Sequence, residues 1–323
     1  MKKTLSTLII TLLMTTLLFG CGKKNTDENL AMENLPLEEA TSPAPEEDIE
    51  IHQSADLDEP DLDQDIDDVY DLPDKNPHPL QIIFLGETNL DAHRNETGMA
   101  YLIGKGCDAK VFNLSIRGST AAAYGNKDCE DGKKQNAKSL VGMSEILAGK
   151  ADGKLISCTR ASELIGELKI EETDYIVIMY GAQDFMKRVT LDGPDNNCCG
   201  GIDTYAGAFR EAIINLRKAA PLADIVLVSP FFAWFYDDDN EYIGDGNTLT
   251  NGKAYLYEYV DKLKRVANEH QIIFADVYHL LGNDANAAKD YLSDGVHLSE
   301  AGRKMMADKL VEMILHHEMT FYN

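Results

Sequence analysis

The sequence is short of the residues that mark several whole classes of protein. Bases are scarce beside acids, with 30 Lys and Arg against 55 Asp and Glu, and the formal net charge is −25. A nucleic-acid-binding protein needs a basic surplus to neutralise phosphates, so nucleic acid is excluded as a main partner. Long apolar runs are lacking beyond the extreme N-terminus. This excludes a polytopic membrane protein, because each membrane-spanning helix needs about 20 apolar residues.

The one apolar run, residues 5–19, is typical of a targeting segment. Two lysines precede it, and Gly20 and Cys21 follow it. A positive start and an apolar stretch too short to span a membrane form the pattern of a secretory signal peptide. The ending Leu-Phe-Gly-Cys resembles the bacterial lipoprotein signal, in which the cysteine is acylated and becomes the mature N-terminus. We therefore predict a lipoprotein signal with a lipidated Cys21 over residues 1–21; the alternative is an ordinary secretory signal.

Residues 22–76 are predicted to form an acidic, disordered tether. Between positions 25 and 76 there are 19 acidic residues and a single base, Lys75, together with several prolines. A segment with this charge and so few apolar residues cannot bury enough surface to fold. A flexible chain of this length spans about 40 Å. The tether would hold the following domain away from the membrane, or it is an inert solubilising linker.

Five cysteines remain after Cys21, and an odd number outside the cytoplasm leaves at least one unpaired. They show no metal-ligand spacing, and the adjacent Cys198 and Cys199 suit neither a zinc site nor a relaxed disulfide with each other. A bridge from Cys129 to one of these two is an option that the sequence does not decide. We predict no metal and no organic cofactor. The five cysteines are Cys107, Cys129, Cys158, Cys198 and Cys199.

The remaining residues, 77–323, alternate between buried-strand and helical patterns and are predicted to form one domain. Apolar runs that predict strands lie at 80–85, 109–114, 174–179, 224–229 and 271–275. Helical patterns lie at 97–105, 139–148, 160–168, 203–219, 253–269 and 299–316. Continuous apolar strands that alternate with helices predict a parallel sheet covered on both faces. The prediction is thus a three-layer α/β/α sandwich with a five-stranded parallel sheet, whose functional groups collect at the carboxyl ends of the strands.

Four strand-end segments carry candidate chemistry. They are Gly86-Glu87-Thr88, Asn113-Leu-Ser-Ile-Arg-Gly-Ser-Thr120, Gly181-Ala-Gln-Asp184 and Asp294-Gly-Val-His297. In this order and spacing they resemble the SGNH or GDSL-type hydrolases, over about residues 80–316. The resemblance implies the flavodoxin-like fold of that family and hydrolysis of an ester.

The resemblance also implies a role for each matching residue. It places the nucleophile of the family at Thr88, the glycine that donates a backbone N–H at Ser115, and the oxyanion-binding asparagine at Gln183. Asp294 and His297 carry the residue types of the family itself. Thr88 retains a hydroxyl but adds a methyl group, Ser115 retains its backbone N–H, and Gln183 retains an amide on a longer side chain.

The chemistry of these groups can be stated from the residue types. The hydroxyl of Thr88, at a predicted sharp turn from strand to helix, would be an exposed nucleophile. His297 would accept its proton and Asp294 would hold the imidazole in the required tautomer. Backbone N–H groups of Thr88 and Ser115, with the Gln183 amide, would receive the negative charge that develops on the substrate.

Each motif also has a structural interpretation when it is taken alone. Thr88 is a common type of helix N-cap, Gln183 and Asp184 suit an ordinary strand-end turn, and Asp294 with His297 suits a hydrogen bond within a loop. The aromatic segment 231–236 either packs against the sheet edge, which we favour, or forms a wall on which a sugar stacks.

The function predicted from the sequence is that of a lipid-anchored ester hydrolase on the extracytoplasmic face of the cell membrane. Its predicted substrate is an acylated carbohydrate or another small ester, with O-acyl or O-acetyl groups of envelope or extracellular glycans as the first choice. This substrate class follows from the signal and the resemblance alone. The alternatives are a degenerate site that binds a glycan or acyl ligand without cleaving it, and acyl transfer in place of hydrolysis.

Overall fold

The structure is a computed structural model that describes residues 79–123, 136–193, 200–237 and 239–322. The predicted signal, the lipidation site Cys21, the tether and the candidate bridge from Cys129 to Cys198 or Cys199 lie outside the described residues. Two described cysteines are free thiols, the buried Cys107 and the exposed Cys158.

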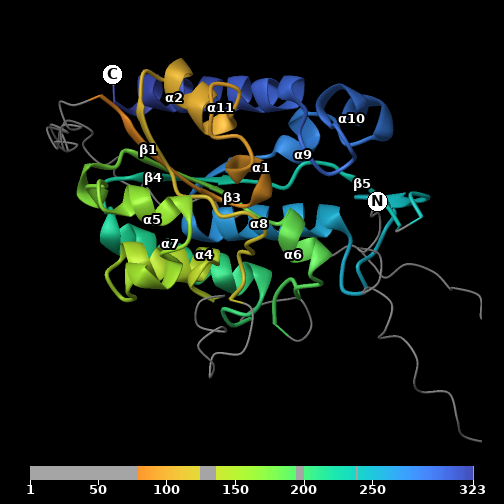
Figure 1. The fold of residues 1–323 in the computed structure, drawn as a ribbon, viewed down its shortest axis with the longest axis horizontal. Coiled ribbons are helices and arrows are strands. Elements are labelled where there is room, and N and C mark those ends of the chain that lie inside the picture. Colours follow the sequence, from red (N-terminus) through yellow and green to blue (C-terminus); the bar gives the residue numbers. More distant parts are fainter. Residues whose placement is uncertain (1–78, 124–135, 194–199, 238, 323) are drawn as a thin grey trace, which may run out of the picture. The chain divides into compact units, whose positions relative to one another are not determined.

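Five parallel strands form the centre of the domain (Figure 1). They are β1 (Gln81–Gly86), β2 (Lys110–Asn113), β3 (Tyr175–Met179), β4 (Asp224–Val228) and β7 (Ile273–Ala275). Their order in the sheet is β2-β1-β3-β4-β7, so after β2, at one edge, the chain passes over β1 to form β3 in the centre of the sheet. Every residue of β1 and β3 is buried, as the apolar runs predict. The predicted five-stranded parallel sheet is confirmed.

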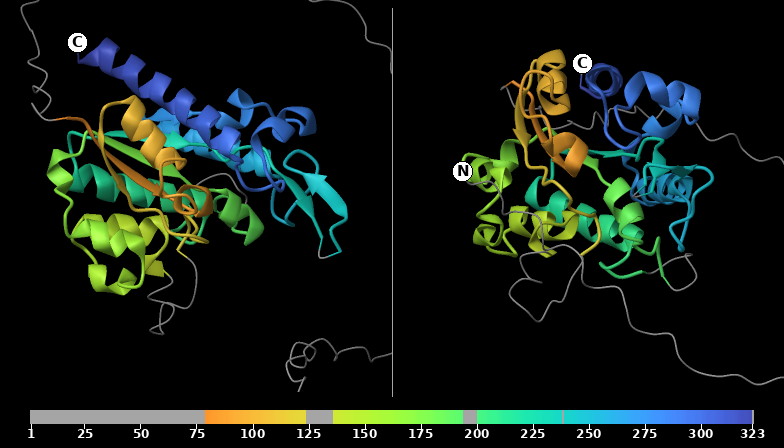
Figure 2. Two further views of the ribbon diagram at one scale, coloured as in Figure 1. Left: turned by 45° about the horizontal axis from the view of Figure 1, so that its top comes forward. Right: turned by 45° about the vertical axis from the view of Figure 1, so that its right-hand side comes forward.

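Helices cover both faces of this sheet (Figures 1 and 2). On one face α2 (Met99–Gly106) packs against the C-terminal helix α11 (Glu300–Phe321). The other face carries α4 (Leu140–Leu147), α5 (Arg160–Ile165), α7 (Tyr205–Ala219) and α8 (Leu256–His270). Each predicted helix is present, and α11 continues past residue 316 because no glycine or proline follows Gly302.

Short elements complete the domain. Two one-turn helices directly follow strands of the sheet: α1 (Thr88–Asp91) follows β1, and α6 (Ala182–Met186) follows β3. The other short elements are η1 (Gly153–Ile156), η2 (Ile170–Glu172), α9 (Val277–Leu280), α10 (Ala285–Tyr291) and an antiparallel hairpin of β5 (Trp234–Tyr236) and β6 (Tyr242–Asp245). In the described part of the chain, no helix has the length and apolar character to cross a membrane.

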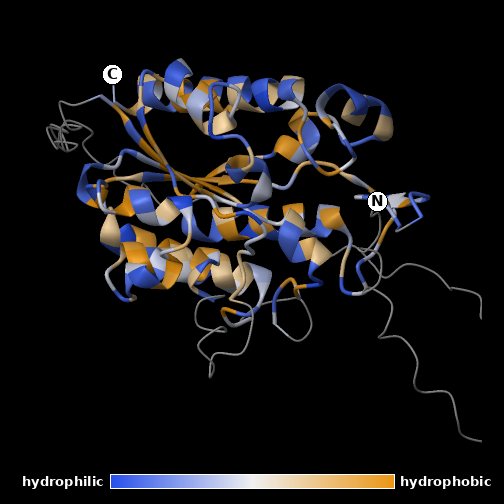
Figure 3. Ribbon diagram, viewed as in Figure 1, coloured by the Kyte–Doolittle hydropathy of each residue, from blue (hydrophilic) through white to orange (hydrophobic). Residues whose placement is uncertain are grey.

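The apolar core lies between the sheet and the two helical layers. Figure 3 shows the strands in hydrophobic colours, with the hydrophilic residues of the helices turned outward. Because all five strands run in the same direction, their carboxyl ends meet at one edge. The predicted site residues Thr88, Ser115 and Gln183 follow β1, β2 and β3 at this edge.

Candidate active site

Thr88 lies at a sharp turn from strand to helix. β1 ends at Gly86, and α1 begins only two residues later. A side chain at position 86 would not fit, because its Cβ would lie 2.4 Å from Leu90 and 3.0 Å from the Met179 carbonyl oxygen. Glu87 is the N-cap of α1 and Thr88 its first residue, so the interpretation of Thr88 as a helix N-cap is wrong.

The hydroxyl of Thr88 faces a backbone donor from the loop that follows β2. The N–H of Gly118 donates to Thr88 Oγ1 at 3.1 Å. Gly118 adopts a φ of +70°, a left-handed conformation that glycine reaches without strain. The ammonium group of Lys187, after α6, donates to the carbonyl of Gly118 and holds this peptide from the other side. A preformed donor therefore lies beside the proposed nucleophile.

The N–H of Ser115, which is predicted as an oxyanion donor, has a partner in its own loop. The N–H of Ser115 donates to Asn113 Oδ1 at 3.1 Å and is already used inside the loop. Gly118, three residues further along, supplies the N–H that meets Thr88. The role of Ser115 as an oxyanion donor stays a prediction, and the contact of Gly118 with Thr88 is one that sequence spacing did not indicate. The glycine itself was the available signal, because left-handed turns favour this residue.

Arg94 fixes the same loop against α1. Its Nη1 and Nη2 donate to the carbonyls of Asn113 and Ser115, both at 2.7 Å, and its Nε donates to Asp91 Oδ1 at 2.7 Å. The other oxygen of Asp91 accepts from the N–H of Arg117 at 2.8 Å. These charge-assisted bonds hold the loop after β2 in place, and with it the donor at Gly118.

Asp294 and His297 form the predicted pair. His297 Nδ1 and Asp294 Oδ2 lie 2.8 Å apart, and Asp294 Oδ1 accepts the backbone N–H groups of Val296 and His297 at 3.2 and 2.9 Å. Burial opposes ionisation of Asp294, but hydrogen bonds from the His297 ring and from both backbone groups outweigh it and lower its pKa below the usual value. The carboxylate thus stays ionised and accepts from Nδ1–H, which leaves Nε2 of His297 free to accept a proton.

Asn89 joins the Thr88 turn to the His297 loop across more than 200 positions of sequence. Its Nδ2 donates to the carbonyl of Val296 at 3.3 Å, and its Oδ1 accepts the N–H of Leu298 at 2.9 Å. The side chain is 7% exposed. Asn89 is thereby hydrogen-bonded to the residues on both sides of His297. The sequence analysis did not predict this role, because a motif does not show which distant residues its side chains contact.

Thr88 and His297 line one cavity of about 470 Å³. Within the described residues they form no direct hydrogen bond with each other. Hydrogen bonds of this kind are often long in an empty site and tighten only when substrate binds. The cavity brings the proposed nucleophile and base together, and Asp294 supports the base from outside the cavity lining.

Gln183 lies in the first turn of α6, and its contacts are made by the backbone. Its N–H donates to Glu87 Oε2 at 2.8 Å, beside the N–H of Ala182, which donates to Oε1 at 3.1 Å. Its side-chain amide makes no hydrogen bond within the described part of the chain, and Gln183 does not line the cavity of Thr88 and His297. Its role as an oxyanion donor stays a prediction.

Two buried carboxyl groups connect the strand ends beneath the site. Glu87 joins the end of β1 to α6, as described above, while Asp184 of α6 accepts the N–H groups of Ala121 and Ala122 at 2.8 and 3.1 Å. Burial, together with the nearby Asp184, raises the pKa of Glu87 to about 8, against the lowering effect of the α6 backbone bonds. Burial likewise raises the pKa of Asp184 to about 6, against the opposing effect of its backbone bonds.

The aromatic segment 231–236 packs into the core and contacts the loop that carries Asp294 and His297. Phe231 and Phe232 are buried in the core. The N–H of Trp234 donates to the carbonyl of Gly295 at 3.0 Å, and a Cβ at Gly295, where φ is +94°, would lie 2.2 Å from the indole. No residue of the segment lines the cavity of Thr88 and His297. The structure favours packing over a sugar-stacking wall.

Comparison with known proteins places this geometry in a family. Residues 85–305 match the GDSL-like lipase/acylhydrolase family. The chain belongs to this family. The matched range holds the turn at Thr88, the loop of Gly118, the start of α6 and the pair of Asp294 and His297.

Solved structures share the fold of this GDSL-like chain. A protein described as a possible lipase from Chitinophaga pinensis is 19% identical, with a TM-score of 0.50, and the match covers 75% of this chain and 100% of that one. A protein from Lactobacillus plantarum is 14% identical, with a TM-score of 0.51 and coverage of 75% and 99%. At these identities the likeness shows the fold alone. A search of curated proteins found no match.

Among the residues that the structure describes, His, Cys, Asp and Glu side chains form no group of three or more suited to hold a metal ion.

Proposed function

We propose that this GDSL-like protein hydrolyses small esters, with Thr88 as the nucleophile and His297 as the general base. The observation that carries the proposal is the arrangement around one cavity: a hydroxyl at a strand-to-helix turn, a backbone N–H directed at its oxygen, and an imidazole held by a carboxylate. These are the groups that nucleophilic ester cleavage requires.

The proposed reaction has two steps. Thr88 Oγ1 attacks the ester carbonyl while His297 Nε2 takes its proton, and the backbone N–H of Thr88 and the Gln183 amide are the predicted donors to the oxyanion that forms. When the carbon–oxygen bond to the leaving alcohol breaks, the imidazolium returns the proton to that alcohol and the acyl group stays on Thr88. Water, deprotonated by His297, then attacks the acyl group; as the bond from the acyl carbon to Thr88 Oγ1 breaks, the imidazolium returns the proton to Oγ1 and a carboxylic acid is released.

The place of action is part of the proposal. A lipidated Cys21 would anchor the protein at the extracytoplasmic face of the cell membrane, and the acidic tether of residues 22–76 would let the domain reach acylated glycans of the envelope. The signal-like N-terminus and the charge of the tether support this. A site that binds such a ligand without turnover is the competing function.

A His297→Ala variant tests the assignment of the base. With 4-nitrophenyl acetate as substrate, we expect kcat/KM to fall by about 10² to 10⁴, the usual contribution of a general base. The matched control is His316→Ala, an exposed histidine of α11, which should keep full activity. Circular dichroism would show that both variants fold. Full activity in folded His297→Ala would remove His297 from the mechanism, and no activity in the unmodified protein would favour the binding function.

A further inference from the structure

Two arginines line the cavity that holds Thr88, and the more buried one lacks a counter-ion. Arg303, in the first turn of α11, is 5% exposed. Its Nε donates to the carbonyl of Thr97 at 2.8 Å and its Nη1 to the carbonyl of Leu298 at 2.9 Å. Within the described residues, no carboxylate forms an ion pair with it. Because a buried charge without a partner is costly, a ligand that brings a negative charge would be favoured here.

Arg117 is the second arginine of this cavity. It is exposed, and only its backbone N–H contacts Asp91. Asp91 is itself paired with Arg94, at 2.7 Å. In the described part of the chain the guanidinium of Arg117 forms no hydrogen bond or ion pair. A free guanidinium with parallel N–H donors is well suited to bind a carboxylate or a phosphate in bidentate fashion.

The pKa of His93, which also lines the cavity, responds to the charges of the groups around it. Burial lowers the pKa of His93, and Arg303 and Arg117 lower it further; the exposed Glu300 opposes them with a smaller effect. Among the residues that line the cavity, two guanidinium groups stand against the single carboxylate of Glu300, so its formal charge is positive although the whole chain carries a net charge of −25. This sign is opposite to that of the molecule and favours an anionic ligand.

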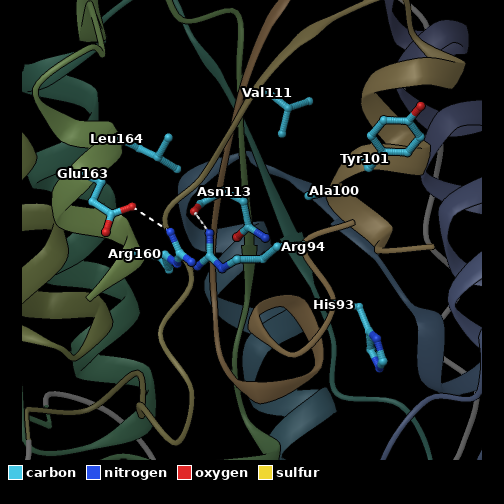
Figure 4. Close-up of a pocket in the computed structure, with 9 residues that line it drawn as sticks. All are labelled: His93, Arg94, Ala100, Tyr101, Val111, Asn113, Arg160, Glu163 and Leu164. Atoms are coloured by element: carbon cyan, nitrogen blue, oxygen red, sulfur yellow. Dashed lines mark hydrogen bonds and ion pairs between the residues drawn. The ribbon is translucent and has the colours of Figure 1, made fainter. Parts of the chain in front are cut away.

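The neighbouring cavity offers a comparison for these two arginines. It has a volume of about 500 Å³, adjoins the first at His93 and lies between α2, β2 and α5 (Figure 4). Its arginines have acidic partners: Arg94 pairs with Asp91, and Arg160 pairs with Glu163 at 3.0 Å, the contact drawn in Figure 4. In the described part of the chain neither Arg117 nor Arg303 forms such an ion pair, and Glu300 is the one carboxylate among the residues that line their cavity.

We propose that the substrate is an ester that carries an anionic group, either a carboxylate or a phosphate, and that Arg117 and Arg303 bind this group beside the reacting carbonyl. The inference rests on the proposed ester hydrolysis and narrows its substrate class. Arg303 provides a fixed charge at the cavity wall, because two carbonyls hold its guanidinium. Arg117 provides an exposed guanidinium that binds the anion from the other side chain position in the cavity lining.

Matched pairs of esters test this preference. The carboxylate pair is an O-acetylated methyl glucuronide and the corresponding methyl glucoside; the phosphate pair is acetylglycerol phosphate and acetylglycerol. We expect kcat/KM to be at least about tenfold higher for the anionic member of one pair, since hydrogen bonds to charged groups are strong. The pair that shows the preference identifies the anion. The preference should weaken as salt is added.

Substitution of Arg117 links the preference to this cavity. Arg117→Gln should bring the two members of the preferred pair to similar kcat/KM. Arg160→Gln, in the neighbouring cavity, is the matched control and should keep the preference. Arg303 is left unchanged because it holds two backbone carbonyls, and its loss would disturb the fold.

The outcomes separate this inference from the proposed function. Equal kcat/KM within both pairs, or a preference that survives in Arg117→Gln, would overturn the inference and leave the esterase assignment intact. If none of the four esters is cleaved, the proposed hydrolysis fails, and calorimetric binding of the same esters decides the inference. Tighter binding of an anionic member that is lost in Arg117→Gln supports it, and equal affinities within both pairs overturn it.

Discussion

At the scale of single residues, the site depends on side chains that position the reacting groups as much as on those groups. Asn89 is the clearest case, because its amide contacts the residues before and after His297 from the turn that carries Thr88. If this amide moves, the distance between the hydroxyl and the imidazole changes as well. A displacement of about 1 Å at a reacting centre can cost about 10² in rate.

An Asn89→Asp variant should separate positioning from catalysis. The change keeps the acceptor for the N–H of Leu298 but replaces the donor to Val296 with an oxygen that repels its carbonyl. We expect kcat on 4-nitrophenyl acetate to fall by about tenfold to a hundredfold, with KM changed much less. Asn95→Asp, at an exposed asparagine, is the matched control and should retain kcat. An unchanged kcat in Asn89→Asp would show that His297 does not need this support.

The sequence predicted Thr88, Asp294 and His297 because these residues occupy the positions of the family motifs in the expected order. The contact between Asp294 and His297 is confirmed. It did not predict the hydrogen bond from the N–H of Gly118 to Thr88 Oγ1, because sequence spacing does not show which N–H of the loop turns toward α1. Such orientation arises from loop dihedrals and long-range contacts.

At the scale of elements, the parallel strands and long helices follow from the sequence, while the short elements do not. The strands are continuous apolar runs, and helices such as α8 carry enough turns to show a helical period. In contrast, α1 and α6 hold four and five residues, too few for a period to show. These short helices carry Thr88 and Gln183, so the least predictable elements build the candidate site.

Glu87 connects two of these elements and makes the stability of the domain depend on pH. Its pKa is raised from 4.5 to about 8, so between these values the folded protein holds a proton that the unfolded chain releases. Stability is therefore highest below pH 4.5 for this group and falls as the pH rises toward 8. Asp184, with its pKa raised from 3.8 to about 6, adds a change of the same sign at lower pH.

A Glu87→Gln variant should reduce this dependence. Thermal unfolding followed from pH 5 to pH 8 should show the melting temperature of the unmodified protein falling more steeply than that of the variant, which has no group to ionise at position 87. An exposed matched control, Glu163→Gln, should keep the slope of the unmodified protein. Parallel curves for Glu87→Gln and the unmodified protein would show that Glu87 does not titrate in this window.

At the scale of the whole molecule, charge is divided unevenly along the chain. Residues 25–76 hold 19 of the 55 acidic residues, whereas Arg117 and Arg303 line the cavity of Thr88. Composition alone predicted a separate tether and folded domain, because charge and hydrophobicity change together near residue 77. Composition could not predict the positive cavity, since Arg117 and Arg303 meet there only in the folded protein.

The proposed anchor can be tested on the whole protein in its cell. Cys21→Ala should move the protein from the membrane fraction to the medium or leave an unprocessed precursor, because lipidation of this cysteine is the proposed attachment. Cys158→Ala, at an exposed free thiol, is the matched control and should remain in the membrane fraction. Unchanged processing and fractionation of Cys21→Ala would remove the lipoprotein assignment.

The central claim is that the hydroxyl of Thr88 is a nucleophile activated by His297, and covalent labelling tests it most directly. A fluorophosphonate reacts with an activated hydroxyl, loses fluoride and stays attached, so mass spectrometry of peptides can locate the adduct. We predict one adduct on residue 88 in the unmodified protein, faster labelling in Thr88→Ser, and none in Thr88→Val or His297→Ala. A folded protein that takes up no label at residue 88, even as Thr88→Ser, would contradict the account.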